Sequence, residues 1–454
     1  MKNHSRLTAL LLALFLLLAS SACSGGETEE TTEATTEASQ TAPETTEAIT
    51  EVTTEEVISV VAPPETTEAP ETKPPKSEEA IRIIMQNGEG EAILSALAED
   101  KYKPLLDARE KALLYEHSAE IELSKADSLE KTIENAVLSG AGKYDLLLIS
   151  PLAGIELLNA GLLENLASAG ISITPDSAGV GRSITESLTV GKGVYLFASD
   201  ALVSDISATY ALKYNGAALS SDPIEKALAG EFTAALMLTY IAEAENAFSV
   251  GSASPVTLFR GAGGEIFTKN DKDVPVSAVT SGTIFATAYD NAQKLYSNAT
   301  DKDAIFTLQR LAPLAEGEIY LPLPKTYSTL EYSTPIDQYS LSLFAAPAGV
   351  VSGSRLNTLV TALAACSSDY RAAVRAEIIE KGAKDSAEML DIIAEGARLD
   401  LGILFGWGDI RDHIAEGFNK STPAADLLAN RMTEMRNKAA ETAASILAGK
   451  LGIE

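Results

Sequence analysis

The sequence predicts an α/β fold that is divided into two lobes and contains a mostly parallel sheet. Strand and helix patterns alternate between residues 80 and 150, and alternation of this kind builds parallel sheets that are covered by helices on both faces. The part of the chain that has such patterns, residues 79 to 454, is longer than the roughly 250–300 residues that one hydrophobic core usually serves. A second core, and therefore a second lobe, is expected.

The first elements follow from the hydrophobic period of each segment. Strand patterns are runs of apolar residues or alternate every second residue, and helix patterns repeat every three to four residues. Five segments carry these patterns in turn, strand first: 80–87, 91–116 with a break at Pro104, 119–124, 128–140 and 144–150. In a sheet of this kind, ligands gather beyond the carboxyl ends of the strands.

The start of the chain indicates a secretion signal of the lipoprotein kind. Lys2 and Arg6 precede an apolar run, residues 10–19, that is far shorter than the roughly 20 residues needed to span a bilayer. Residues 1–22 are therefore predicted to be a lipoprotein signal peptide, and Cys23 the lipidated first residue on the extracellular face of the cell membrane. Such signals usually carry Leu where this chain has Ser20, so cleavage by ordinary signal peptidase is the alternative.

Residues 23–78 form a Thr/Glu/Pro-rich segment in which the tetrad Thr-Thr-Glu-Ala recurs. Such a segment has almost nothing apolar to bury, so it cannot offset the entropy lost on ordering, and it is expected to be disordered. Its 14 Glu outnumber its 2 Lys, and the excess of like charges repels along the chain and extends it. We therefore expect a tether that holds a folded domain away from the lipid surface.

Charge and composition argue against two classes of function. The chain has a net charge of −29, of which residues 79–454 carry −19, and it has no basic patch with interleaved aromatic residues, so nucleic-acid binding is not expected. With 3 His in the chain there is no His-Glu-x-x-His motif and no partner set for a Ser or Cys nucleophile. Neither an enzyme nor a bound cofactor or metal is predicted.

Two further features have plain structural interpretations. The glycines at 261–264 lack the Lys-Ser/Thr of a phosphate-binding loop, so they predict a tight turn. Cys366 lies in an apolar helical stretch and is expected to be a small buried thiol.

Several segments match, in order, motifs of one known family. They are Tyr144–Leu152 followed by Asn159–Leu166, Gly191–Asp200 with Asp205–Tyr210, Phe259–Gly264, Ile319–Lys325, and Asp385–Ile393 with Asp400–Gly402. By these segments, which span most of residues 79–454, the chain resembles the extracellular solute-binding proteins of bacterial ABC importers (family 1-like), particularly clostridial lipoproteins. Two departures are Gly230-Glu231-Phe232, where relatives commonly have Gly-Lys-Trp, and the presence of a single Trp.

The resemblance implies a two-lobed, periplasmic-binding-protein-like (type II) clamp, in which each lobe is a mostly parallel sheet flanked by helices. The ligand would lie in the cleft between the lobes, and the chain would cross between them more than once. The expected parts are an N-terminal lobe at 79–206, a C-terminal lobe at 207–339, a return to the N-terminal lobe at 340–395 and C-terminal helices at 396–454.

The function implied is capture of a small solute, with a carbohydrate or oligosaccharide favoured, and its delivery to the transmembrane subunits of an ABC permease by a monomeric, lipid-anchored protein. The alternative is a surface lipoprotein that binds a ligand or wall component for sensing or adhesion without transport. Seven residues are candidates for ligand contact because they end strands, flank the expected crossings or adjoin glycine turns: Asn87, Ser150, Asp200, Asp205, Arg260, Tyr339 and Trp407. A structural role is the alternative for each of them, and for Trp407 that role is to fill the core.

Overall fold

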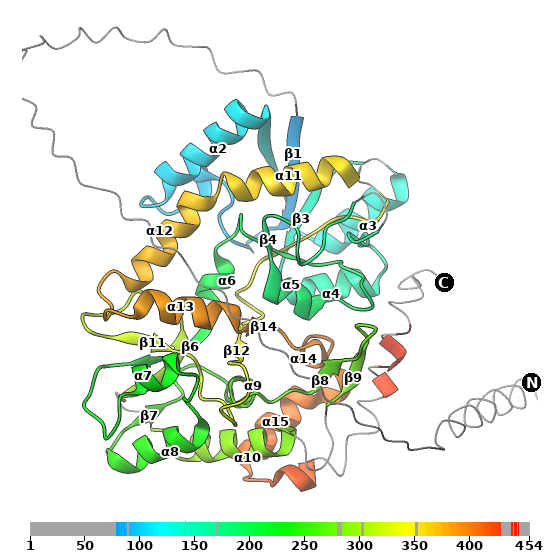
Figure 1. Ribbon diagram of the computed structural model, residues 1–454. Coiled ribbons are helices and arrows are strands. Elements are labelled where there is room, and N and C mark those ends of the chain that lie inside the picture. Colours follow the sequence, from blue (N-terminus) through cyan, green and yellow to red (C-terminus); the bar gives the residue numbers. More distant parts are fainter. Residues whose placement is uncertain are drawn as a thin grey trace, which may run out of the picture. The chain divides into compact units, whose positions relative to one another are not determined.

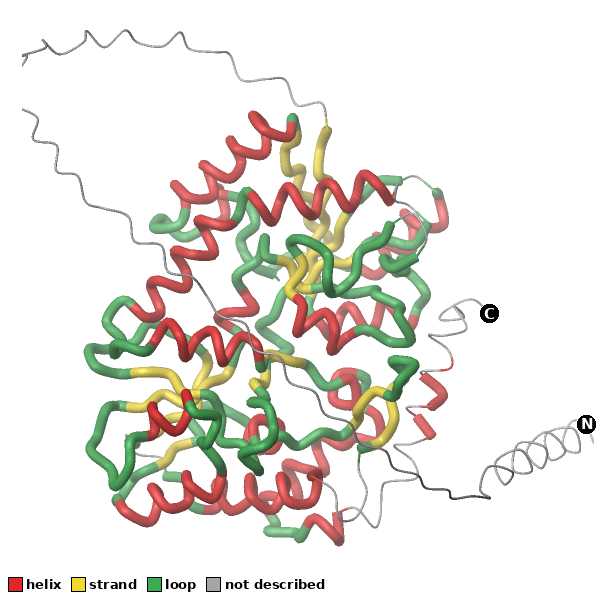
Figure 2. The backbone as a smooth tube through the Cα atoms, in the orientation of Figure 1, coloured by secondary structure: helices red, strands yellow, loops and turns green. Residues whose placement is uncertain are grey.

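The computed structural model describes residues 79–427 except 89, 141, 169–170, 279–283, 301–303 and 350–352, and also 437–438, 440–442 and 444 (Figure 1). The predicted signal peptide, Cys23 and the predicted tether lie outside the described residues. Within them, two four-stranded sheets and their helices confirm the α/β class (Figure 2). No helix in the described part of the chain is long and apolar enough to cross a membrane.

The first sheet has the strand order β13-β3-β1-β2. Its central strand β1 (Glu79–Gln86) pairs in parallel with β2 (Ala119–Ala126) and with β3 (Leu146–Ile149), as the alternating pattern predicts. The edge strand β13 (Leu343–Ala345) runs antiparallel to β3, so a segment nearly 200 residues later in the chain completes this sheet.

Both faces of the first sheet are covered by helices, because side chains of a strand point to alternate faces. Ile81, Ile83 and Met85 pack with α2 and α11 on one face, whereas Ile84 packs with α3, α4 and α5 on the other. These helices are α2 (Lys103–His117), α3 (Leu129–Ser139), α4 (Pro151–Asn159), α5 (Arg182–Leu188) and α11 (Gly353–Ala365). We call this sheet and its helices the first lobe.

The second sheet has the order β11-β6-β10-β7, with β6 (Tyr210–Tyr214) antiparallel to both β10 (Phe306–Arg310) and β11 (Ile319–Leu321). Only β7 (Phe248–Ser249) pairs in parallel, with β10. The expectation of a mostly parallel sheet is therefore wrong for this lobe. The strands are antiparallel because the chain runs through β6 and β10 in opposite directions. β6 begins at Tyr210, and β10 ends at Arg310, which pairs with Tyr210.

The second sheet has a hydrophobic core of its own, as a two-lobed fold requires. Its helices are α7 (Pro223–Leu228), α8 (Ala234–Glu243), α9 (Pro255–Gly261), α10 (Ile284–Ser297) and α15 (Ile410–Asn419). The first three begin at side-chain caps such as Asp222, whose carboxylate accepts a hydrogen bond from Ile224 N at 2.8 Å. The predicted tight turn after α9 is confirmed, with Gly264 N donating to Phe259 O at 2.9 Å. We call this sheet and its helices the second lobe.

The chain passes between the two lobes more than once, as the resemblance implies. The chain enters the second sheet after α6 (Ser204–Ser207) and returns to the first sheet with β13. It leaves the first lobe again after α11, because α13 (Ser386–Glu395) packs on β11 and α15 packs on α9. The lobe boundaries given above stay a prediction. The remaining elements are β4 (Val180–Gly181), β5 (Ala198–Ser199), β8 (Phe267–Lys269), β9 (Pro275–Ser277), β12 (Thr334–Pro335), α12 (Ser368–Ile379), α13 (Ser386–Glu395), β14 (Ala397–Arg398), α14 (Leu401–Leu404) and the 3-10 helices Ser95–Leu97 and Trp407–Asp409.

Candidate functional site

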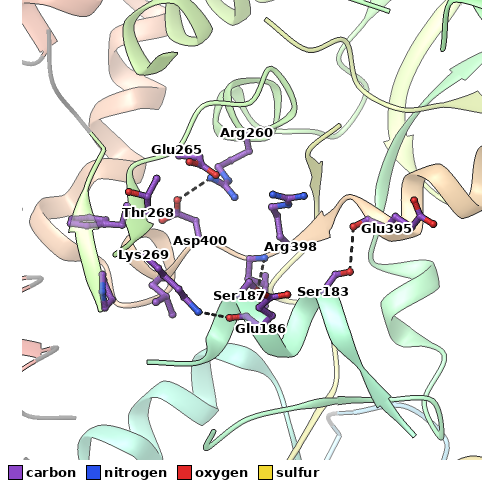
Figure 3. Close-up of a pocket in the computed structure, with 14 residues that line it drawn as sticks. Ser183, Glu186, Ser187, Arg260, Glu265, Thr268, Lys269, Glu395, Arg398 and Asp400 are labelled. Carbon is purple, nitrogen blue, oxygen red and sulfur yellow. Dashed lines mark hydrogen bonds and ion pairs between the residues drawn. The ribbon is translucent and has the colours of Figure 1, made fainter. Parts of the chain in front are cut away.

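A polar cavity of about 350 Å³ is bounded by elements of both lobes (Figure 3). One wall is α5 of the first lobe, and the opposite walls are α9, the β8–β9 hairpin and the segment that joins α13 to α14. The residues that line it are Ser183, Glu186, Ser187, Arg260, Glu265, Phe267, Thr268, Lys269, Pro275, Glu395, Arg398, Leu399, Asp400 and Leu401.

The polar face of α5 forms the first-lobe wall because the opposite face of this helix is buried. Ile184 and Leu188, four residues apart, pack into the first-lobe core, which leaves Ser183 and Ser187 on the cavity side. The Ser183 hydroxyl donates to Glu395 O at 3.3 Å, and the Ser187 hydroxyl accepts a hydrogen bond from Leu399 N at 3.2 Å. These two hydrogen bonds join α5 to the segment that leads into α14.

A buried ion pair joins α9 of the second lobe to the residue that precedes α14. Arg260 Nη1 lies 3.1 Å from Asp400 Oδ2, and their side chains are 6% and 1% exposed. Arg260 also donates to Gly264 O at 2.9 Å, and Asp400 Oδ1 accepts from Ile403 N at 3.1 Å, so the carboxylate caps α14 as well. Arg260 thus lines the cavity, whereas its contact with a ligand stays a prediction.

A second guanidinium, that of Arg398, lies between the α5 serines and Arg260 (Figure 3). Its Nε donates to Gly396 O at 3.2 Å, and no carboxylate of the described residues forms an ion pair with it. The remaining donors of Arg398 are therefore free to bind a ligand, while Glu186, Glu265 and Glu395 supply acceptors around the same space.

The β8–β9 hairpin closes one side of the cavity by contacting the first lobe. Asp273, in the hairpin turn, accepts hydrogen bonds from Gly191 N at 2.8 Å through its carbonyl and from Lys192 N at 3.3 Å through its carboxylate. Lys269 donates to the carbonyl of Glu186 and lies 3.3 Å from Asp273 Oδ1. Burial lowers the pKa of Lys269 below its usual range, and the charge of Asp273 opposes that shift. Lys192 and Asp273 both have the left-handed backbone that non-glycine residues rarely adopt, with φ of 68° and 59°.

Asp205, another predicted ligand contact, lines a neighbouring cavity of about 120 Å³ instead. Both of its carboxylate oxygens accept hydrogen bonds from Arg371, with Nη1–Oδ1 at 2.7 Å. Burial alone would lower the pKa of Arg371, but the hydrogen bonds and charge of Asp205 outweigh it, and the pKa is raised. In this structure Asp205 ties α6, at the first crossing between the lobes, to α12.

Four other predicted contacts line neither of these cavities. Asn87 and Ser150 do follow the ends of β1 and β3, as predicted, but the Asn87 amide donates to Asp127 Oδ1 at 3.2 Å and the Ser150 hydroxyl caps α4 by accepting from Ala153 N at 3.3 Å. Asp200 is partly buried, and its backbone N donates to Gly179 O at 3.0 Å. Tyr339 is 64% exposed, and its hydroxyl accepts a hydrogen bond from Arg411.

Trp407 requires a correction, because its ring does not project freely from the glycines beside it. The side chain is buried, 3% exposed, with Phe405 stacked at 5.2 Å and Phe267 edge-on at 4.6 Å between ring centroids. Its indole N–H donates to Thr442 Oγ1 at 3.0 Å. The alternative role, a ring that fills the core, is the one this structure shows, although Phe267, which the ring supports, lines the cavity.

Most residues of the cavity lining were not predicted from the sequence. Ser183, Glu186, Ser187, Lys269 and Arg398 come from three separate elements that only the fold brings together. A signal was present in α5, where Ile184 and Leu188 at helical spacing indicate a buried face and leave a serine-rich face opposite.

The chemistry of the cavity suits a neutral, hydroxyl-rich molecule. Arginine, lysine and serine donors and carboxylate acceptors all line it, and Phe267 is the one aromatic side chain among the described residues of the lining. Among the residues that the structure describes, neither Cys nor His lines this cavity.

Comparisons with known proteins give similarity to solved structures only, since neither a family model nor a curated protein matches the chain. A cyclo/maltodextrin-binding protein complexed with maltotetraose is 15% identical, with 82% of this chain and 98% of that chain covered and a TM-score of 0.49. The galacto-N-biose/lacto-N-biose I-binding protein of an ABC transporter from Bifidobacterium longum, in complex with lacto-N-biose, is 14% identical, with 82% and 98% covered and a TM-score of 0.46. An ABC transporter associated binding protein from B. animalis subsp. lactis, in complex with beta-1,6-galactobiose, is 12% identical, with 81% and 99% covered and a TM-score of 0.44.

Proposed function

We propose that this protein is an extracellular solute-binding protein, which captures a small polar solute in the cavity between its two lobes and delivers it to an ABC permease. The observation that carries the proposal is the origin of the cavity walls, since α5 belongs to the first lobe and Arg260, in α9, belongs to the second. A ligand that contacts both walls stabilises the arrangement in which they face each other, because those contacts exist only there. Binding is thereby coupled to closure, which a permease can recognise.

The favoured ligand is a carbohydrate or short oligosaccharide. The cavity volume, about 350 Å³, lies near the lower end of the range for small-molecule sites. Hydroxyl groups can accept hydrogen bonds from Arg398 and donate to Glu186 or Glu265, and a sugar ring can pack on Phe267.

The membrane attachment belongs to the same proposal. Cys23 carries the lipid, residues 23–78 form the tether, and a monomeric binding domain reaches the permease from the extracellular face. Support comes from the order of charged start, apolar run, small residues and cysteine at the beginning of the chain, and from the compositional change near Glu78.

A thermal-shift screen of sugars, oligosaccharides, amino acids and peptides tests the proposal. A ligand at a hundred times its dissociation constant stabilises the folded state by about 2.7 kcal/mol. For a ligand found in this way, Arg398→Ala should weaken binding about tenfold or more, since a hydrogen bond to a charged group contributes roughly 1.5–3 kcal/mol. Lys131→Ala removes an exposed cation on α3, away from the cavity, and serves as the control. If no compound stabilises the protein, or if Arg398→Ala binds the ligand as tightly as Lys131→Ala does, the proposal is wrong.

A further inference from the structure

Three side chains that are known as metal ligands meet where two helices of the first lobe end. Glu116 and His117 are the last two residues of α2, and Cys366 directly follows the last residue of α11. A carboxylate oxygen of Glu116, an imidazole nitrogen of His117 and the sulfur of Cys366 all lie within 4.8 Å of one another. None of the three lines the solute cavity, so this group is independent of the proposed function.

We infer that Glu116, His117 and Cys366 bind a divalent transition ion of the Zn²⁺ type. Zinc takes sulfur, nitrogen and oxygen ligands at roughly 2.0–2.3 Å. The ligand atoms of a tetrahedral zinc site therefore lie somewhat closer to one another than the 4.8 Å within which these three atoms lie. Small side-chain rotations close that difference, because Glu116 and His117 are exposed and Cys366 is only partly buried. A thiol with an imidazole selects zinc-like ions over magnesium or calcium, which prefer oxygen ligands alone.

The backbone around the site also favours a cation. The carboxyl end of a helix carries a partial negative charge from its unpaired carbonyls, and Glu116 and His117 are the last residues of α2. This helix end, with the Glu116 carboxylate, attracts a divalent ion.

The two helix ends are held in place by contacts beneath the surface. Arg109 of α2 is 2% exposed and donates to Ser367 Oγ at 3.4 Å, next to Cys366. Ser367 Oγ in turn donates to Leu363 O at 2.6 Å, and Cys366 N donates to Ala362 O at 3.0 Å. The ligands therefore stand on packed helices whose relative position is fixed, which reduces the ordering that metal binding would otherwise require.

Three protein ligands leave the fourth position of a tetrahedral ion to water. The site therefore differs from a closed structural zinc site, in which four side chains surround the metal, and its occupancy depends on the free metal concentration. A bound ion links α2 to the junction of α11 and α12, so we expect it to stabilise the first lobe.

Cobalt and zinc titrations of the full-length protein test the inference. A Cys23→Ala background leaves Cys366 as the single thiol, because the chain has 2 cysteines. Co²⁺ should then produce a thiolate-to-cobalt charge-transfer band in the near ultraviolet, Zn²⁺ should abolish that band by competition, and Cys366→Ser should lack it. His117→Gln and Glu116→Gln should each weaken Zn²⁺ binding by about tenfold or more, whereas Glu134→Gln, an exposed carboxylate on α3, should leave it unchanged.

A second measurement needs no variant of the ligands. Zn²⁺ should slow the reaction of Cys366 with a thiol reagent in the Cys23→Ala background, because a coordinated thiolate is shielded from attack. Absence of the cobalt band together with unprotected thiol reactivity would overturn the inference, and so would a zinc affinity that is unchanged in both His117→Gln and Glu116→Gln. Failure of solute binding would leave these results unaffected.

Discussion

Replacement of Asp400 by alanine should destabilise the protein strongly, because this carboxylate has two roles in the cavity wall. It pairs with Arg260, whose side chain is only 6% exposed, and it caps α14 through Ile403 N. Removing one partner of a buried ion pair leaves an uncompensated charge and costs about 3–5 kcal/mol. Loss of the helix cap adds about 1 kcal/mol. The unfolding free energy of Asp400→Ala should therefore fall by about 4–6 kcal/mol.

Urea unfolding followed by circular dichroism measures this change. Asp400→Asn retains an acceptor for the helix cap and should lose less stability than Asp400→Ala. Replacing both partners with apolar residues, Arg260→Met with Asp400→Leu, should recover much of the loss, since no buried charge is then unpaired. As a control, Asp412→Ala breaks a surface pair with Arg411, whose side chain is 45% exposed, and should cost less than about 1 kcal/mol. If Asp400→Ala costs no more than Asp412→Ala, the ion pair does not hold this wall of the cavity.

Four further predictions concern pH, the hairpin, the tether and the anchor. Burial raises the pKa of Asp145, but hydrogen bonds from two arginines outweigh it and hold the pKa below its usual range; the stability that Asp145 contributes is present at neutral pH and lost as the pH falls below about 4, so Asp145→Asn should destabilise at pH 7, and its difference from wild type in unfolding experiments should shrink as the pH falls below about 4. Asp273→Ala removes the acceptor for Lys192 N and should weaken solute binding about fivefold in calorimetry with little change in melting temperature, whereas unchanged affinity would show that the hairpin does not contribute to closure. A chain that starts at Ser77 should melt within error of the longer mature chain, and a large drop would show that the segment before it packs on the domain. Cys23→Ala should release the protein into the medium and abolish labelling by a fatty-acid probe, and unlabelled wild-type protein would contradict the lipid anchor.

Local patterns were sufficient to predict the first three strands of the first lobe and the helices between them. The strand at 144–150 has apolar residues on both faces, so its burial and its parallel partner follow from hydrophobicity and from the helices that connect the strands. The second sheet was harder because its strands β6, β10 and β11 are short and their direction is set by where the chain crosses between lobes. The place of that crossing depends on contacts between residues that are far apart in the sequence, and the periodicity of hydrophobic residues gives no information about such contacts.

The residues of the candidate site were even harder to predict from local patterns, for the same reason. Arg260 was singled out beside a glycine turn, and it does line the cavity, but its partner Asp400 lies 140 residues further along the chain. Trp407 sits between glycines, a setting compatible with a projecting ring or a buried one, and only the packing of Phe405 and Phe267 decides between them. Arg398 has no local signal at all, since its exposure to the cavity results from the meeting of β14 with α5.

A crystal structure of the protein with the solute found in the screen would show directly whether the solute binds between the lobes. The solute should lie in the cavity between α5 and the β8–β9 hairpin, with a hydroxyl or other acceptor on the guanidinium of Arg398 and further contacts to both lobes. A solute bound to one lobe alone, or at a place from which Ser183, Arg260 and Arg398 are all remote, would contradict it.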